Sequence, residues 1–111
     1  MNVIVIMLDS LRQDHISFYN KGKSVFEGVK PCKIPNIDEL AKESVVFKNM
    51  YPKGLPTIPA RTELMTGHGT LASRPWEPLN PRDITIAEIL NKEGYTCGFI
   101  TDTYHFIERP E

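Results

Sequence analysis

The feature that most constrains the fold of this 111-residue chain is an apolar run close to its N-terminus. The run, Val3 to Leu8, is mostly β-branched and does not alternate with polar residues. Parallel strands covered on both faces have this pattern, whereas a strand with one solvated face alternates. The run therefore predicts an interior strand of a parallel sheet, with Asp9 at its carboxyl end.

Helical patterns alternate with further short apolar segments along the chain. Two capping boxes, each a polar residue followed three positions later by Glu, indicate helix starts at Asn36 with Glu39 and at Thr85 with Glu88. Residues 45–47 and 95–101 are predicted strands, and Gly94 is a predicted helix end. The alternation predicts an α/β fold with a mostly parallel sheet flanked by helices.

Composition limits the class of protein. A net charge of −1 gives no basic field for nucleic acid, so no nucleic-acid partner is expected. The apolar run at 3–8 is too short to span a bilayer and lacks a basic leader, so we expect no membrane association and a cytoplasmic location. Cys32 and Cys97 match no metal spacing and are read as free thiols.

The stretch 55–67 is typical of a loop that runs into a helix with a nucleophile at its mouth. Thr57 is predicted at or just before the helix cap, Pro59 in the first turn, and Gly67 at the end. The free amides of such a helix and the guanidinium of Arg61 favour anionic oxygens. The alternative is a plain helix cap at Thr57 with a solvated Arg61.

Asp9 has two interpretations as well. Ligands gather beyond the carboxyl ends of strands in α/β sheets, which suits a metal-binding carboxylate, but an Asp that caps the following turn fits equally. Shortly after it, Arg12 and Asp14 are expected to pair and hold the loop, and no catalytic role is assigned to His15.

Three stretches together resemble the N-terminal part of the sulfatases, within the alkaline phosphatase superfamily. They are the strand ending at Asp9 with the Leu11 to His15 run after it, the segment 34–51, and the Thr57 turn. The resemblance implies that Asp9 and Thr57 are ligands of a divalent metal ion, Ca²⁺, Mn²⁺ or Zn²⁺. Many sulfatases carry a second acid where this chain has Ser10.

Departures from the family pattern bear on the chemistry. Most sulfatases have a Cys or Ser, oxidised to formylglycine, at the position of Thr57; the methyl group of a threonine prevents formation of that aldehyde. Direct attack by Thr is the pattern of the superfamily's phosphodiesterases. His68 stands where sulfatases usually have Arg, and residues 101–105 replace a Gly-Lys-x-His ending, with His105 implied to contact the substrate oxyanion.

These observations predict a sulfatase-like, metal-dependent hydrolase of small-molecule sulfate or phosphate esters, with Thr57, Arg61 and His105 catalytic. Residues 1–111 are expected to be the N-terminal fragment of a single sulfatase-like domain, inactive alone because the later metal ligands are missing. The alternatives are a phosphodiesterase or phosphonate hydrolase that uses Thr57 directly, and a non-catalytic sulfatase-like binding protein. A nucleotide-binding domain is disfavoured, since no Gly-rich fingerprint follows the first strand.

Overall fold

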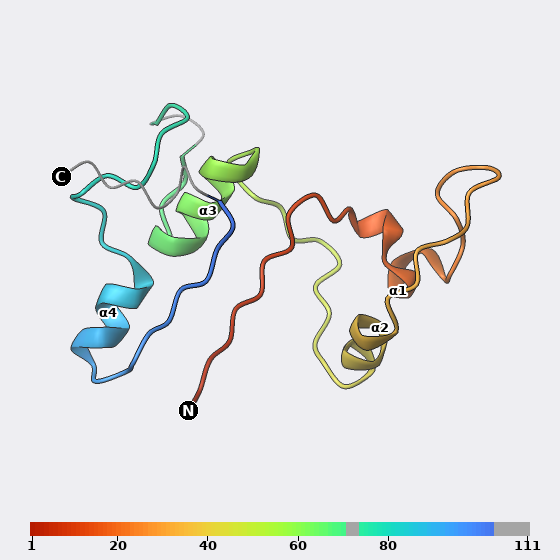
Figure 1. The fold of residues 1–111 in the computed structure, drawn as a ribbon, viewed down its shortest axis with the longest axis horizontal. Helices are drawn as coiled ribbons and strands as arrows, with labels where there is room; N and C mark the ends of the chain where they lie inside the picture. Colours follow the sequence, from red (N-terminus) through yellow and green to blue (C-terminus); the bar gives the residue numbers. More distant parts are fainter. Residues whose placement is uncertain (71–73, 104–111) are drawn as a thin grey trace. The chain divides into compact units, whose positions relative to one another are not determined.

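The computed structural model describes residues 1–70 and 74–103 of the chain. The chain forms two compact units, Met1–Met50 and Tyr51–Glu111. All regular structure in the described residues is helical (Figure 1). No helix in this part of the chain is long and apolar enough to cross a membrane.

The first unit has three short helical elements, and residues 22–33 form an irregular loop. They are the 3-10 helix η1 (Gln13–His15), α1 (Ser17–Asn20) and α2 (Pro35–Lys42) (Figure 1). Helix α1 contacts both η1 and α2. The Tyr19 hydroxyl donates to the Phe47 carbonyl at 3.2 Å, and the Gln13 side chain donates to the Lys48 carbonyl at 3.3 Å. These two hydrogen bonds connect residues 47 and 48 to α1 and η1.

Helix α2 confirms the helix predicted after residue 36 but begins differently. Pro35 lies in its first turn and Ile34 is the N-cap, without a side-chain cap hydrogen bond. Proline has its φ fixed near the helical value, so the helix starts ahead of Asn36. Glu39 forms an ion pair with Lys42 at 2.6 Å. The capping box predicted for Asn36 and Glu39 is therefore wrong.

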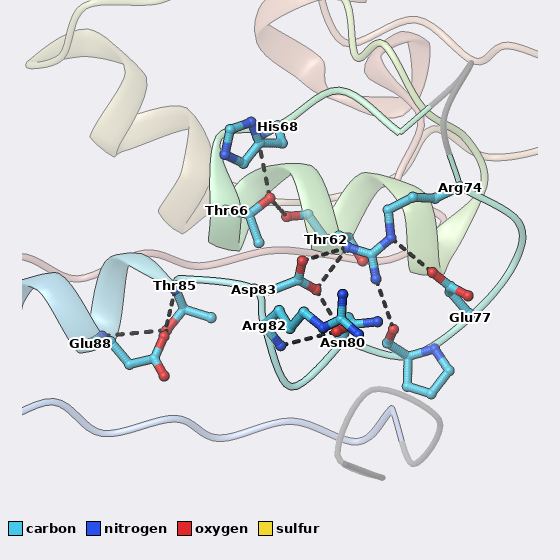
Figure 2. Close-up of polar contacts among 11 residues, drawn as sticks. Thr62, Thr66, His68, Arg74, Glu77, Asn80, Arg82, Asp83, Thr85 and Glu88 are labelled. Carbon is cyan, nitrogen blue, oxygen red and sulfur yellow. Dashed lines mark hydrogen bonds and ion pairs between the residues drawn. The ribbon is translucent and has the colours of Figure 1, made fainter. Parts of the chain in front are cut away.

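The second unit contains α3 (Thr57–Thr66) and α4 (Ile86–Lys92), which contact each other. Helix α3 ends at Gly67, whose φ of 72° is the left-handed conformation expected of a terminating glycine. Thr85 caps α4: its hydroxyl accepts the Glu88 N–H at 3.3 Å, and its own N–H donates to the Glu88 carboxylate at 2.6 Å (Figure 2). The capping box predicted at Thr85 is confirmed.

The described core is small and lies in the second unit. Ile58 and Leu79 are its buried hydrophobic side chains, 2% and 6% exposed, and Met65 packs against them. Ile58 directly follows Thr57, so burial of Ile58 also fixes the start of α3. The core therefore holds the helix on which the predicted nucleophile stands.

The predicted parallel sheet is not formed in the described residues. Residues 3–8, expected in its interior, are 42–85% exposed, and the predicted strands at 45–47 and 95–101 are likewise without regular structure. A strand needs hydrogen-bonded neighbours and, in a parallel sheet, cover on both faces. An apolar β-branched run indicates suitability for a sheet, but its partners must come from elsewhere in the chain.

Candidate functional site

Thr57 is the first residue of α3, and Pro56 is the N-cap. The sequence predicted Thr57 at or just before the cap. The helix starts there because the Pro56 carbonyl accepts the first helical bond, from the Ala60 N–H at 3.2 Å. Pro59 lies in the first turn, as predicted, where the lack of an N–H costs nothing.

The start of α3 has the electrostatic character that an anion requires. Amides in the first turn of a helix have no acceptor within the helix, and the helix dipole adds positive potential at that end. Thr57 is partly buried. Within residues 1–70 and 74–103 its hydroxyl makes no hydrogen bond. The hydroxyl is therefore not used to cap the helix in the described structure.

Arg61 lies one turn after Thr57 on the same face of α3. Its side chain is 12% exposed. Nη1 donates to the Thr101 hydroxyl at 3.1 Å, and Nη2 lies 3.9 Å from the carboxylate of Asp102, which is 94% exposed. Arg61 is thus held in a defined position, which contradicts the alternative of a solvated side chain.

Thr101 and Asp102 are contacts of Arg61 that the sequence reasoning did not assign. The Thr101 hydroxyl also accepts the Thr103 N–H at 3.1 Å, so the end of this segment is folded around it. The available signal was the replacement of the family's Gly-Lys-x-His ending at these positions. His105, predicted to contact the substrate, lies outside the described residues.

Asp9 belongs to the first unit and Thr57 to the second. Asp9 is exposed and accepts a hydrogen bond from the Ser10 hydroxyl at 3.0 Å, with Ser10 in the left-handed conformation at φ 59°. The pairing of Asp9 with Thr57 around a metal ion stays a prediction. The described residues contain no group of three His, Cys, Asp or Glu side chains that could hold a metal ion. The described residues therefore do not complete a metal centre by themselves.

The Arg12 and Asp14 pair predicted to hold the loop is confirmed. Arg12 Nε donates to one Asp14 carboxylate oxygen at 2.9 Å, and Nη2 donates to the other at 2.5 Å. These hydrogen bonds from Arg12 lower the pKa of Asp14. The pair is exposed, so its role is to shape the turn after Asp9 rather than to do chemistry.

A second polar cluster closes the loop after α3. Arg74 is its centre (Figure 2), donating to both oxygens of Asp83 at 2.8 and 2.7 Å, to Glu77 at 3.0 Å and to the Pro78 carbonyl at 3.2 Å. Burial alone would raise the pKa of Asp83, but the hydrogen bonds from Arg74 and from the Asn80 N–H leave that pKa lowered. The described partners of the Arg74 side chain lie within residues 77–83, so these hydrogen bonds hold this segment of the chain together.

His68 and the two cysteines lie outside this chemistry. His68 is exposed, and its backbone N–H donates to the Thr66 hydroxyl at 3.2 Å (Figure 2). Cys32 and Cys97 are free thiols, as predicted.

Among curated proteins, the chain is 32% identical over 109 residues to the multifunctional alkaline phosphatase superfamily protein PehA of Trinickia caryophylli, covering 92% of this chain and 20% of that protein. It is 26% identical over 111 residues to iduronate 2-sulfatase of Mus musculus, covering 95% and 18%. It is 29% identical over 121 residues to arylsulfatase A of Bos taurus, covering 99% and 22%.

The chain thus spans about a fifth of the length of these relatives. No solved structure matches it. The family implies an alkaline-phosphatase-like α/β fold and generally uses a divalent metal ion. A family model described as Sulfatase matches residues 1–108, nearly the whole chain, and confirms the resemblance seen in the sequence: this chain belongs to the sulfatase family.

Proposed function

We propose that this chain carries the part of an active site that contains the nucleophile, in a hydrolase of small-molecule sulfate or phosphate esters. The observation that supports this most is the arrangement at the start of α3: Thr57 on its first turn, with Arg61 one turn later and 12% exposed. A hydroxyl, free helix amides and a guanidinium together suit a tetrahedral anion.

In the proposed reaction the Thr57 oxygen attacks sulfur or phosphorus as the bond to the leaving alcohol oxygen breaks. The Thr57 hydroxyl gives up its proton, and the leaving oxygen takes one up. Water then cleaves the threonyl ester, which releases sulfate or phosphate and restores the hydroxyl. The guanidinium of Arg61, held by Thr101 through Nη1, stabilises charge on the non-bridging oxygens. His105 is the further oxyanion contact of the proposal.

A divalent cation belongs to the proposal, with Asp9 and Thr57 as two of its oxygen ligands. When bound, such an ion supplies positive charge to the anion and lowers the pKa of the hydroxyl. A hard cation such as Ca²⁺ takes about six to eight oxygen ligands, so two side chains are too few. We therefore expect residues 1–111 alone to bind Ca²⁺, Mn²⁺ or Zn²⁺ weakly and to turn over no ester.

The extent of the chain is part of the same proposal. Because it spans about a fifth of its relatives, we infer that residues 1–111 are the N-terminal part of one sulfatase-like domain of mostly parallel sheet and helices. In that domain residues 3–8 would gain the strand neighbours that they need. The cytoplasmic location stays a prediction from the sequence.

The test is a panel of aryl sulfate, aryl phosphate and aryl phosphodiester substrates with the natural full-length protein and added divalent metal. Thr57→Ala should abolish turnover, whereas Thr57→Ser, which keeps the attacking oxygen, should retain part of it. Full activity of Thr57→Ala would show that Thr57 is not the nucleophile.

Thr57→Cys separates the two proposed chemistries. In cells with a formylglycine-generating enzyme, this cysteine is expected to raise sulfatase activity if the site is that of a sulfatase. A phosphodiesterase that uses Thr57 directly should instead lose rate. A non-catalytic binding protein is the second candidate, favoured by the absence of a formylglycine precursor at Thr57. It predicts no turnover on the panel but measurable binding of the esters.

A further inference from the structure

The carboxylate of Glu63, on α3, accepts hydrogen bonds from the backbone before and after that helix. Its Oε2 accepts the N–H of Lys53 at 3.1 Å. Its Oε1 accepts the N–H of Thr70 at 2.8 Å and the Thr70 hydroxyl at 3.2 Å. Lys53 precedes the helix and Thr70 follows it, so one side chain joins the chain entering α3 to the chain leaving it.

Close packing around Gly54 makes this arrangement specific. Gly54 and Thr70 are both buried. A Cβ at Gly54 would lie 2.3 Å from the Thr70 hydroxyl oxygen and 2.8 Å from Glu63 Oε1. Only glycine lets the backbone come this close to the carboxylate and its partner.

The carboxylate is ionised at neutral pH. The Thr70 N–H is the largest influence that lowers the pKa of Glu63; the Gly54 N–H, the Thr70 hydroxyl and the Lys53 N–H act in the same direction, against desolvation. An ionised carboxylate accepts at both oxygens and donates at neither. Glu63 can therefore serve donors from two loops at once.

We propose that Glu63 is a positioning residue for Thr57. Only Leu55 lies between Gly54 and Pro56, whose carbonyl accepts the first bond of α3. The backbone that leads into Thr57 is thus fixed at one end by Glu63 and at the other by the helix, and this places Thr57 one turn before Arg61. The part of this inference that concerns turnover rests on the proposed function.

A purely structural role for Glu63 makes a different prediction. If Glu63 merely stabilised the unit, its loss would disturb every part of the unit alike. If it positions Thr57, the disturbance is confined to the start of α3 and its two loops. The readout must therefore compare Thr57 with a distant threonine of the same unit, and Thr85, the cap of α4, is suitable.

The test is Glu63→Gln in the natural full-length protein, followed by NMR of threonine methyl groups. Glutamine keeps the shape but puts an NH₂ donor against one of the backbone N–H groups. We expect the Thr57 methyl resonance to shift or broaden while that of Thr85 stays in place. Glu93→Gln is the matched control, because it makes the same chemical change at an exposed residue of the same unit. An unmoved Thr57 resonance, or equal changes at Thr57 and Thr85, would overturn the inference.

Kinetics supply the second readout. Glu63→Gln should lower kcat at least about tenfold with KM nearly unchanged, because misplacing a reacting group acts on the chemical step. Glu63→Asp, which keeps the charge but shortens the reach, should fall between Glu63→Gln and wild type. A wild-type protein that hydrolyses no ester would refute the proposed function, while the methyl resonances would still decide whether Glu63 positions Thr57.

Discussion

Arg61→Lys tests the anion site most directly, because lysine keeps the charge but loses the planar fork of donors. In the structure the two terminal nitrogens of Arg61 have separate tasks. Nη1 binds the Thr101 hydroxyl at 3.1 Å, and Nη2 lies 3.9 Å from the Asp102 carboxylate. The single nitrogen of lysine cannot hold the Thr101 hydroxyl and an anion oxygen in the same geometry.

The expected loss follows from this geometry. A hydrogen bond to a charged group contributes about 1.5–3 kcal/mol. Lysine retains part of the Coulomb attraction, and the 94% exposed Asp102 contributes little, so the lower part of this range applies. A loss of about 1.5–2 kcal/mol corresponds to about a 10- to 30-fold decrease in kcat/KM.

The assay is kcat/KM of the natural full-length protein on the ester of the panel that it hydrolyses best. Thr101→Val keeps Arg61 but removes its hydroxyl acceptor, and should cost about two- to tenfold in kcat/KM, less than Arg61→Lys, because the charge and the fork of donors are both kept. Arg82→Lys is the matched control, because Arg82 is exposed. If Arg61→Lys retained kcat/KM within twofold, Arg61 would not bind the reacting anion through its fork.

Three further predictions concern the framework around the site, each measured by urea unfolding of the full-length protein. Thr85→Ala should lower the free energy of unfolding by about 1 kcal/mol through loss of the helix cap, and Thr85→Ser should not. Arg74→Lys should cost about 2 kcal/mol, between the values for exposed and buried ion pairs, since Arg74 and Asp83 are each 18% exposed. Because the pKa of Asp83 is lowered on folding, its contribution is full above the ordinary Asp pKa of about 3.9 and is lost as the pH falls through the lower folded value. Asp83→Asn should remove this acid dependence, and an unchanged pH profile would contradict it.

Helix ends were the most predictable part of the fold, because their signals lie within a few residues of one another. Gly67 and Gly94 both adopt positive φ, at 72° and 85°, as their positions after α3 and α4 predicted. The capping box at Thr85 formed for the same reason. The box predicted at Asn36 failed, since Pro35 fixed an earlier start.

Only the part of the candidate site that lies on one helix could be predicted from the sequence. Thr57 and Arg61 share a face of one helix, so their spacing was enough to place them together. The contact of Arg61 with Thr101 joins residues forty positions apart, and no local pattern reports such a contact. Glu63 was overlooked because it accepts mainly from backbone N–H groups, which every sequence contains.

The predicted sheet depends on contacts between residues far apart in the sequence, which a local pattern does not report. The run 3–8 has the composition of an interior strand, yet its side chains are 42–85% exposed in the described structure. Parallel strands pair across crossovers of a dozen or more residues, so the pattern of one strand says nothing about whether its neighbours are present. Leaving such apolar side chains in water forfeits about 1.5–3 kcal/mol for each large one. That cost is a physical reason to expect residues 3–8 to pair once the remaining part of a sulfatase domain is present, which would bring Asp9 to the carboxyl edge of a sheet. If Asp9→Asn left both metal affinity and turnover of the full-length protein unchanged, this placement of Asp9 would be wrong.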